Sequence, residues 1–261
     1  MASPLHQFEI KKVVELPDVN VPGLGAVDLS ITNSTVAMMM AAGLIVLFMS
    51  IVTAKPAVVP GRVQSVGEMI FGFMDNLAHS IIGQEGRKFL PFLLTLFLFI
   101  LAMNLLGMFL VFTATSQLAV TATLAAMSIL TVLIVGFLRN GLGFFKLFVP
   151  SGVPIYLMPL IVPIEVISFL MRPLTLALRL FGNMLGGHVV LKIFAGFVVS
   201  LGALAASGGV GLLGLPVAAL SLGGVVALTA LEFLVAFLQA FVFAVLTCVY
   251  LNDVVNLGHH H

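Results

Sequence analysis

The sequence predicts an all-α, polytopic membrane protein. Hydrophobic residues make up 61% of its 261 residues and charged residues only 8%, whereas soluble domains are about 25% charged. Several apolar runs are also long enough to cross a hydrocarbon core of about 30 Å, and a helix satisfies its own backbone hydrogen bonds there. The net charge of +1 gives no sign of nucleic-acid binding. The single cysteine, Cys248, excludes an intramolecular disulfide and is expected to be a small buried hydrophobe.

The first half of the chain reads as four segments. Residues 1–35 are polar and mixed in charge, and we expect them on the outer side, before a first transmembrane helix at 36–54. In 60–87 the apolar residues recur at three- or four-residue steps with charged residues between them. That spacing predicts an amphipathic helix on the cytoplasmic side, lying on the membrane surface or against other helices. Residues 89–138 hold two apolar spans joined by a short polar turn, which predicts a transmembrane hairpin.

Lysine and arginine positions predict the orientation. The cations of the short loops fall on one side of these spans, at Lys55, Arg62, Arg87, Lys88, Arg139 and Lys146. Such loops are normally cytoplasmic, so the N-terminus should be outside and the C-terminus inside. The Pro- and Gly-containing segment 139–159 then reads as a cytoplasmic connection or a shallow re-entrant loop. Residues 252–261 form a tail, and its terminal histidines are left out of the interpretation because they are either native or a tag remnant.

The last part, 160–251, is expected to be a long helical hairpin. Two apolar segments, 160–204 and 216–251, flank a Gly- and Ala-rich stretch. The first would be about 65 Å long as one helix, about twice the thickness of the membrane core. Either it breaks near Arg172–Pro173, or it is steeply tilted. Two steep helices would present a broad face along which a second protein slides. The G-x-G-x-x-G string at 209–214 lies between membrane helices, so nucleotide binding there is not expected.

Arg179 is the most informative residue of this hairpin. Arginine does not lose its charge in a low-dielectric site, and at a bilayer centre it costs about 2.5–3.5 kcal/mol on insertion scales. Such a cation needs a partner, a cavity or an ion path. Glu165, Arg172 and Arg179 share a stripe because they are seven residues apart, and Ser168 and Asn183 fall near it. Along the same stripe, Gly182 and Gly186 form a G-x-x-x-G pair that would let another helix approach closely.

Proton-carrying side chains lie on both sides of Arg179. In an antiparallel hairpin, His188 and Glu232 fall toward the outer end and Glu165 toward the cytoplasm, while Gln239 shares a face with Glu232. Histidine titrates near neutrality, and Asp, Glu and His chains inside membranes build proton relays. The pattern therefore favours two groups of proton carriers separated by a permanent cation.

Structural interpretations remain open for several of these residues. Glu165 could lie at the headgroup boundary or pair with Arg172, and His188 with Glu232 could be a purely structural pair. For Asn104 we favour an interhelical hydrogen bond over a transport role, and for Lys192 a side chain that snorkels outward. A purely structural Arg179 is disfavoured, since no carboxylate lies one helical turn away.

These residues resemble subunit a of the F-type ATP synthase. The resemblance covers nearly the whole chain and rests on 163–165, on 172–184 with its Leu178-Arg179-Leu180-Phe181-Gly182-Asn183 core, on 238–243 and on 246–251. The opening residues 3–10 look like alphaproteobacterial and related mitochondrial members. The resemblance implies a membrane stator with two offset half-channels that carry protons to and from carboxylates of a rotating c-subunit ring. It also implies that the chain does not catalyse nucleotide chemistry and binds neither a cofactor nor a metal.

The family's site residues carry over position by position. Its essential arginine corresponds to Arg179, and its outer half-channel to Asn183, His188, Glu232 and Gln239. The inner half-channel corresponds to Glu165 with Ser168 beside it. Some bacterial members carry the acid and the histidine at the positions of His188 and Glu232 the other way round. This exchange suggests that the two residues are spatial partners.

The resemblance also implies partners and a location. The partners are the c ring, b-type peripheral-stalk subunits, the catalytic head, lipid and protons. The location is the bacterial inner membrane, or alternatively the mitochondrial inner membrane. Two other classes remain as alternatives. A self-contained channel or carrier would conduct without a ring, but no inverted repeat is evident. A structural membrane protein would tolerate substitution of Arg179, His188 and Glu232.

Overall fold

The computed structural model describes residues 10–15, 19–21, 25–27, 30–54, 57–109, 113–149, 154–206 and 214–257. Most of the G-x-G-x-x-G string and the terminal histidines lie outside these residues. Six helices dominate the described chain: α1 (Asn33–Thr53), α2 (Arg62–Ile82), α3 (Gly86–Phe109), α4 (Leu118–Asn140), α5 (Met158–Ala206) and α6 (Gly214–Val255). Five helical segments are long and apolar enough to cross a membrane, and α2 is not among them. The all-helical, polytopic prediction is therefore confirmed.

Short strands precede α1, and the sequence had not indicated them. Strand β1 (Lys12–Val14) pairs antiparallel with β4 (Ile31–Thr32), and β2 (Val19–Val21) pairs with β3 (Gly25–Val27). The side chain of Thr32 then caps α1 by accepting a hydrogen bond from the Thr35 amide at 3.4 Å. Such a cap satisfies one of the amides that the first helical turn leaves without a partner.

Helix α2 lies against other helices. Its buried residues Met74, Ala78 and Ile82 are four apart and form the stripe that packs into the fold, where the helix contacts α1, α3 and α6. Gly83 caps its C-terminal end with a φ of 84°, a backbone conformation that favours glycine. Of the two placements that its amphipathic pattern allowed, packing against neighbouring helices is the one observed.

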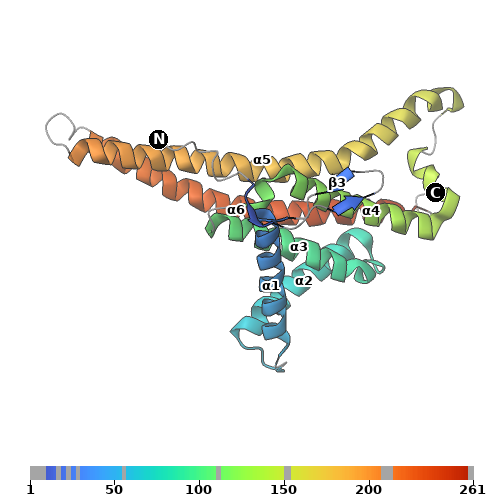
Figure 1. The fold of residues 1–261 in the computed structure, drawn as a ribbon. Helices are drawn as coiled ribbons and strands as arrows, with labels where there is room; N and C mark the ends of the chain where they lie inside the picture. The colour runs from blue at the N-terminus through green and yellow to red at the C-terminus, as the bar shows by residue number, and fades with distance from the viewer. Residues whose placement is uncertain are drawn as a thin grey trace.

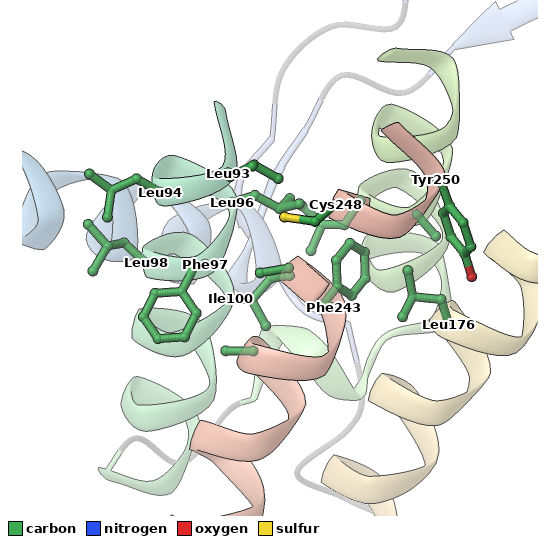
Figure 2. Packing of buried hydrophobic residues seen from close by; sticks show 14 of the residues in the cluster. Leu93, Leu94, Leu96, Phe97, Leu98, Ile100, Leu176, Phe243, Cys248 and Tyr250 are labelled. Atoms are coloured by element: carbon green, nitrogen blue, oxygen red, sulfur yellow. The ribbon is translucent and has the colours of Figure 1, made fainter. Parts of the chain in front are cut away.

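The core forms where α3, α4 and α5 meet α6. Leu93, Leu96 and Ile100 of α3 point toward Phe243 and Cys248 of α6, as Figure 2 shows. Cys248 is fully buried there, as expected of a small hydrophobe. Interhelical hydrogen bonds add specificity: Asn104 Nδ2 of α3 donates to the Ala236 carbonyl at 3.2 Å, and the hydroxyls of Ser128 and Thr247 join α4 to α6 at 2.8 Å. Asn104 thus makes the interhelical contact that we favoured.

Two short 3-10 segments, Gly141–Phe148 and Ile155–Leu157, lie in the described part of the connection before α5. Helix α5 is then continuous over 49 residues with Pro163 and Pro173 inside it. It does not break at Arg172–Pro173, although its ribbon bends in the yellow part of Figure 1. Helices α5 and α6 run side by side and crosswise to α1 (Figure 1). An unbroken α5 is about 74 Å long, so the steeply tilted alternative is the one that a membrane core of about 30 Å requires.

Candidate functional site

Arg179 lies on a face of α5 that the other described residues leave open. Its side chain is exposed, and within the described residues it makes no hydrogen bond and no ion pair. A guanidinium stays charged in any protein environment. The chain therefore presents a permanent cation at an open face of a membrane helix.

Arg172, two turns earlier, has the opposite environment. Its Nη1 is 3.0 Å from Oδ2 of Asp253 at the end of α6. Its guanidinium carbon lies 5.1 Å from the ring centroid of Tyr250 and 5.8 Å from that of Phe169. Asp253 is thus the partner of Arg172. The sequence had left open that Glu165 is this partner. Asp253 could have been found from the sequence as an acid in the predicted tail, because an antiparallel hairpin brings the end of α6 close to the first part of α5.

Asn183 and Gln239 connect the two long helices one turn beyond Arg179. Asn183 Nδ2 donates to Oε1 of Gln239 at 3.0 Å. Gln239 is only 3% exposed, and its own Nε2 has no hydrogen-bond partner within the described part of the chain. A neutral amide pair can transmit hydrogen bonds without adding a second charge beside Arg179.

His188 and Glu232 meet farther along the same helix pair. His188 Nδ1 is 3.4 Å from Glu232 Oε1, an ion-pair distance without hydrogen-bond geometry. Glu232 is 6% exposed, and neither carboxylate oxygen has a hydrogen-bond partner among the described residues. A buried carboxyl without such partners is costly in its charged form. The pair is therefore better suited to exchanging a proton than to holding a permanent carboxylate beside a permanent imidazolium.

Two residues that the sequence analysis did not single out shape this pair. A Cβ at Gly187 would lie 2.8 Å from Glu232 Oε1, so the glycine makes room for the carboxylate. Thr113, between α3 and the short 3-10 segment Ala114–Ser116, has its Oγ1 3.0 Å from His188 Nε2. Neither residue is charged or unusual in an apolar chain, so only the packing reveals its place.

A cavity of about 230 Å³ lies between α5 and α6 beside Glu232. Asn183, Gly186, Gly187 and Glu232 line it together with aliphatic side chains of both long helices. It is large enough for several water molecules, whose share of liquid volume is about 30 Å³ each, and it offers polar partners to them. Glu232 and Asn183 thus border one space on the way toward Arg179.

The cytoplasmic-side candidates do not contact one another. Glu165 is half-buried and Ser168 is exposed on α5, and no hydrogen bond joins either side chain to another described residue. Lys192 is exposed one turn beyond His188, as snorkelling predicts. A Cβ at Gly182 or Gly186 of the G-x-x-x-G pair would meet nothing within 4 Å. No helix of the described chain packs there, so the approach of another helix stays a prediction, whereas a Cβ at the neighbouring Gly187 would lie 2.8 Å from Glu232 Oε1.

Comparisons with known proteins decide the family. The family model described as ATP synthase A chain matches residues 35–252. The chain belongs to the ATP synthase A chain family. The relative named ATP synthase subunit a from Hyphomonas neptunium is 52% identical over 98% of this chain and 97% of its own length. The proteins of the same name from Rhizobium leguminosarum bv. trifolii and Rhodopseudomonas palustris are 52% and 49% identical over 98% and 99% of this chain.

Membership fixes the broad function. The chain is the proton-channel stator subunit of the F-type ATP synthase, and it is not itself catalytic. The family and function indicated by the arginine block are thus confirmed. A self-contained carrier and a purely structural membrane protein are no longer needed as alternatives.

Proposed function

We propose that two offset half-channels in this chain deliver protons to, and collect them from, carboxylates on a rotating c ring, and that Arg179 blocks a direct leak between them. The observation that carries the proposal is the exposed guanidinium of Arg179 on α5, which pairs with no carboxylate of the described residues and is flanked by proton-carrying groups in both directions along the chain. A cation held there lowers the pKa of a rotor carboxyl that faces it. It also repels a proton that would cross directly.

The outer half-channel consists of His188, Glu232, Asn183 and Gln239. The 3.4 Å approach of His188 to Glu232 and the 3.0 Å hydrogen bond of Asn183 to Gln239 support this assignment. The cavity between them offers room for water that carries a proton from Glu232 toward the rotor site. A proton entering from outside thus neutralises the rotor carboxylate, which then leaves Arg179 and enters lipid.

The inner half-channel consists of Glu165 and Ser168. Glu165 is half-buried on the stripe of Arg179 and makes no ion pair with another described residue, while Arg172 between them is paired with Asp253. Glu165 is therefore free to accept the proton that a rotor carboxyl releases as it returns to Arg179. Ser168 on the exposed face supplies a hydroxyl beside that route.

The proposal also includes an orientation of the chain in the membrane and a set of partners. Arg62, Arg87, Lys88, Arg139 and Lys146 lie in or beside the loops that the positive-inside rule assigns to the cytoplasm. We therefore place the N-terminus in the periplasm and the C-terminus in the cytoplasm of a bacterial inner membrane, in line with the bacterial relatives. The c ring faces α5 and α6, while b-type stalk subunits and the catalytic head complete the complex.

Thiol labelling from each side tests the two half-channels separately. In the assembled complex with Cys248→Ala, we expect Gly186→Cys to react with a charged thiol reagent added outside. Ser168→Cys should react with reagent added inside. Thr123→Cys is the control, because its position is exposed on α4 outside both proposed half-channels and its hydroxyl bonds the Ala119 carbonyl. Reaction of both channel cysteines from the same side would overturn the two-sided arrangement.

Neutralising the outer acid tests its role in proton entry. We expect Glu232→Gln to assemble normally and to slow ATP-driven proton pumping by about a hundredfold, the lower end of the range for a lost general acid–base group. Glu68→Gln is the matched control, since Glu68 is exposed on α2. Pumping by Glu232→Gln that equals the wild type at every pH would remove Glu232 from the route.

A further inference from the structure

Thr113 occupies a buried position between three groups. It is 2% exposed, and its hydroxyl oxygen is 3.3 Å from the carbonyl oxygen of Gly107 and 3.0 Å from Nε2 of His188. The position is tightly packed, because a Cβ at Gly107 would lie 2.4 Å from Thr113 Cγ2. Ser116 also donates its hydroxyl to the Thr113 carbonyl at 2.6 Å. The side chain is therefore held in one place.

The single hydroxyl hydrogen of Thr113 has two possible acceptors. The Gly107 carbonyl is one of the last four of α3, which ends at Phe109, and these carbonyls have no donor within the helix itself. Leaving a carbonyl unsatisfied in an apolar interior is expensive. The hydroxyl therefore donates to Gly107. Its oxygen is then left to accept, so His188 Nε2 must carry the hydrogen of the second bond.

We propose that Thr113 is a positioning residue that fixes His188 as the Nε2–H tautomer and thereby leaves the unprotonated Nδ1 facing Glu232. This inference rests on the proposed role of His188 and Glu232 in the outer half-channel. The proton of a neutral Glu232 carboxyl moves to Nδ1, which leaves a carboxylate beside an imidazolium, and it returns along the same line. The Nε2–H stays on Thr113 throughout, so the ring does not need to rotate.

Few other groups compete for the ring. Among the described residues, the charged or titratable groups that face His188 are Glu232 on α6 and Lys192 one turn away on α5. Lys192 is exposed, whereas the Glu232 carboxyl is buried beside the ring. With Thr113 on one nitrogen and Glu232 on the other, the surroundings of the ring distinguish its two nitrogens.

The tautomer is directly measurable. In the assembled complex with ¹⁵N-labelled histidine, the His188 signals are assigned by their loss in His188→Gln and recorded at alkaline pH, where the ring is neutral. We expect one tautomer, protonated at Nε2, in the wild type and in Thr113→Ser, and a mixture in Thr113→Val. A wild-type ring protonated at Nδ1 overturns the proposal, and that result needs no variant to assemble.

Proton pumping separates this inference from the proposed function. We expect Thr113→Val to slow ATP-driven pumping about fivefold, the effect of losing one ordinary hydrogen bond, and Thr113→Ser to restore it. Thr115→Val is the matched control, since Thr115 is fully buried two residues away and its hydroxyl has no partner among the described residues. Slow pumping in His188→Gln with normal pumping in Thr113→Val refutes only the role of Thr113. Normal pumping in His188→Gln refutes the outer half-channel itself.

Discussion

Arg172 and Arg179 lie two turns apart on one stripe of α5, yet their surroundings are opposite. Arg172 pairs with Asp253 and stacks against Tyr250 and Phe169, whereas Arg179 is exposed and makes no ion pair with a described residue. A paired arginine fixes helices to each other. An unpaired one in a membrane helix needs a partner from outside the chain. The difference shows that position on a helix does not set the role of an arginine, because the neighbouring helix does.

The largest expected effect is that of Arg179→Ala. We expect ATP synthesis and ATP-driven proton pumping to be lost completely while the complex assembles, because the Arg179 side chain makes no hydrogen bond or ion pair with a described residue. Arg87→Ala is the control, since its side chain is 76% exposed outside the proposed route. Pumping is measured as acidification of liposomes that contain the complex. Substantial pumping by Arg179→Ala would contradict a separate role in proton transport for Arg179 compared with Arg172.

Gly187→Ala tests whether proton pumping depends on the position of the outer acid, Glu232. The new Cβ would come within 2.8 Å of Glu232 Oε1, the mobile end of a side chain, so Glu232 can shift away without disrupting the fold. We expect near-normal thermal stability with pumping reduced severalfold, because the carboxyl leaves His188. Gly196→Ala is the matched control on the same helix, where a Cβ meets nothing within 4 Å. Equal pumping by both variants would show that the position of Glu232 is not critical.

Arg172→Ala should behave as a structural change. Losing the Asp253 pair and the ring contacts should lower the free energy of unfolding by about 1–2 kcal/mol, because the pair is only partly buried. That corresponds to a melting temperature roughly 2–8 °C lower. Pumping should persist in the complexes that assemble. A double-mutant cycle with Asp253→Ala measures the coupling, and an additive result would deny that the pair stabilises the hairpin.

The smallest effect concerns Glu85, in the turn between α2 and α3. Ion pairs with Lys88 and Arg139 lower the pKa of Glu85 to about 2. A lowered pKa stabilises the fold above the ordinary value of 4.5, and that stabilisation is lost as the pH falls toward 2. Glu85→Gln should therefore lower the melting temperature slightly at pH 7 and still less at pH 3. A difference that grows on acidification contradicts this account.

The sequence could predict the spans because about 20 apolar residues are what a bilayer requires. It could also nominate Arg179, His188, Glu232, Asn183 and Gln239, because polar groups are conspicuous in such helices. The strands before α1 were missed because they are only two or three residues long. The continuity of α5 through Pro173 depends on neighbouring helices that a proline rule does not consider.

The remaining misses at the site share one cause. Asp253 becomes the partner of Arg172 only once the hairpin closes. Thr113 and Gly187 matter through close contacts with His188 and Glu232, and their residue types carry no signal of their own. Spacing along one helix therefore identified the charged groups, but it could not identify the groups that position them.

The central claim is that Arg179 separates two half-channels, and passive proton flux tests it most directly. Liposomes containing the complex without nucleotide are given an imposed potential, with and without the c ring, for wild type, Arg179→Ala and Arg172→Ala. We predict a ring-dependent proton leak in Arg179→Ala that exceeds that of both other proteins. A tight Arg179→Ala complex, or equal flux through the chain without its ring, would contradict the role of Arg179 as the barrier.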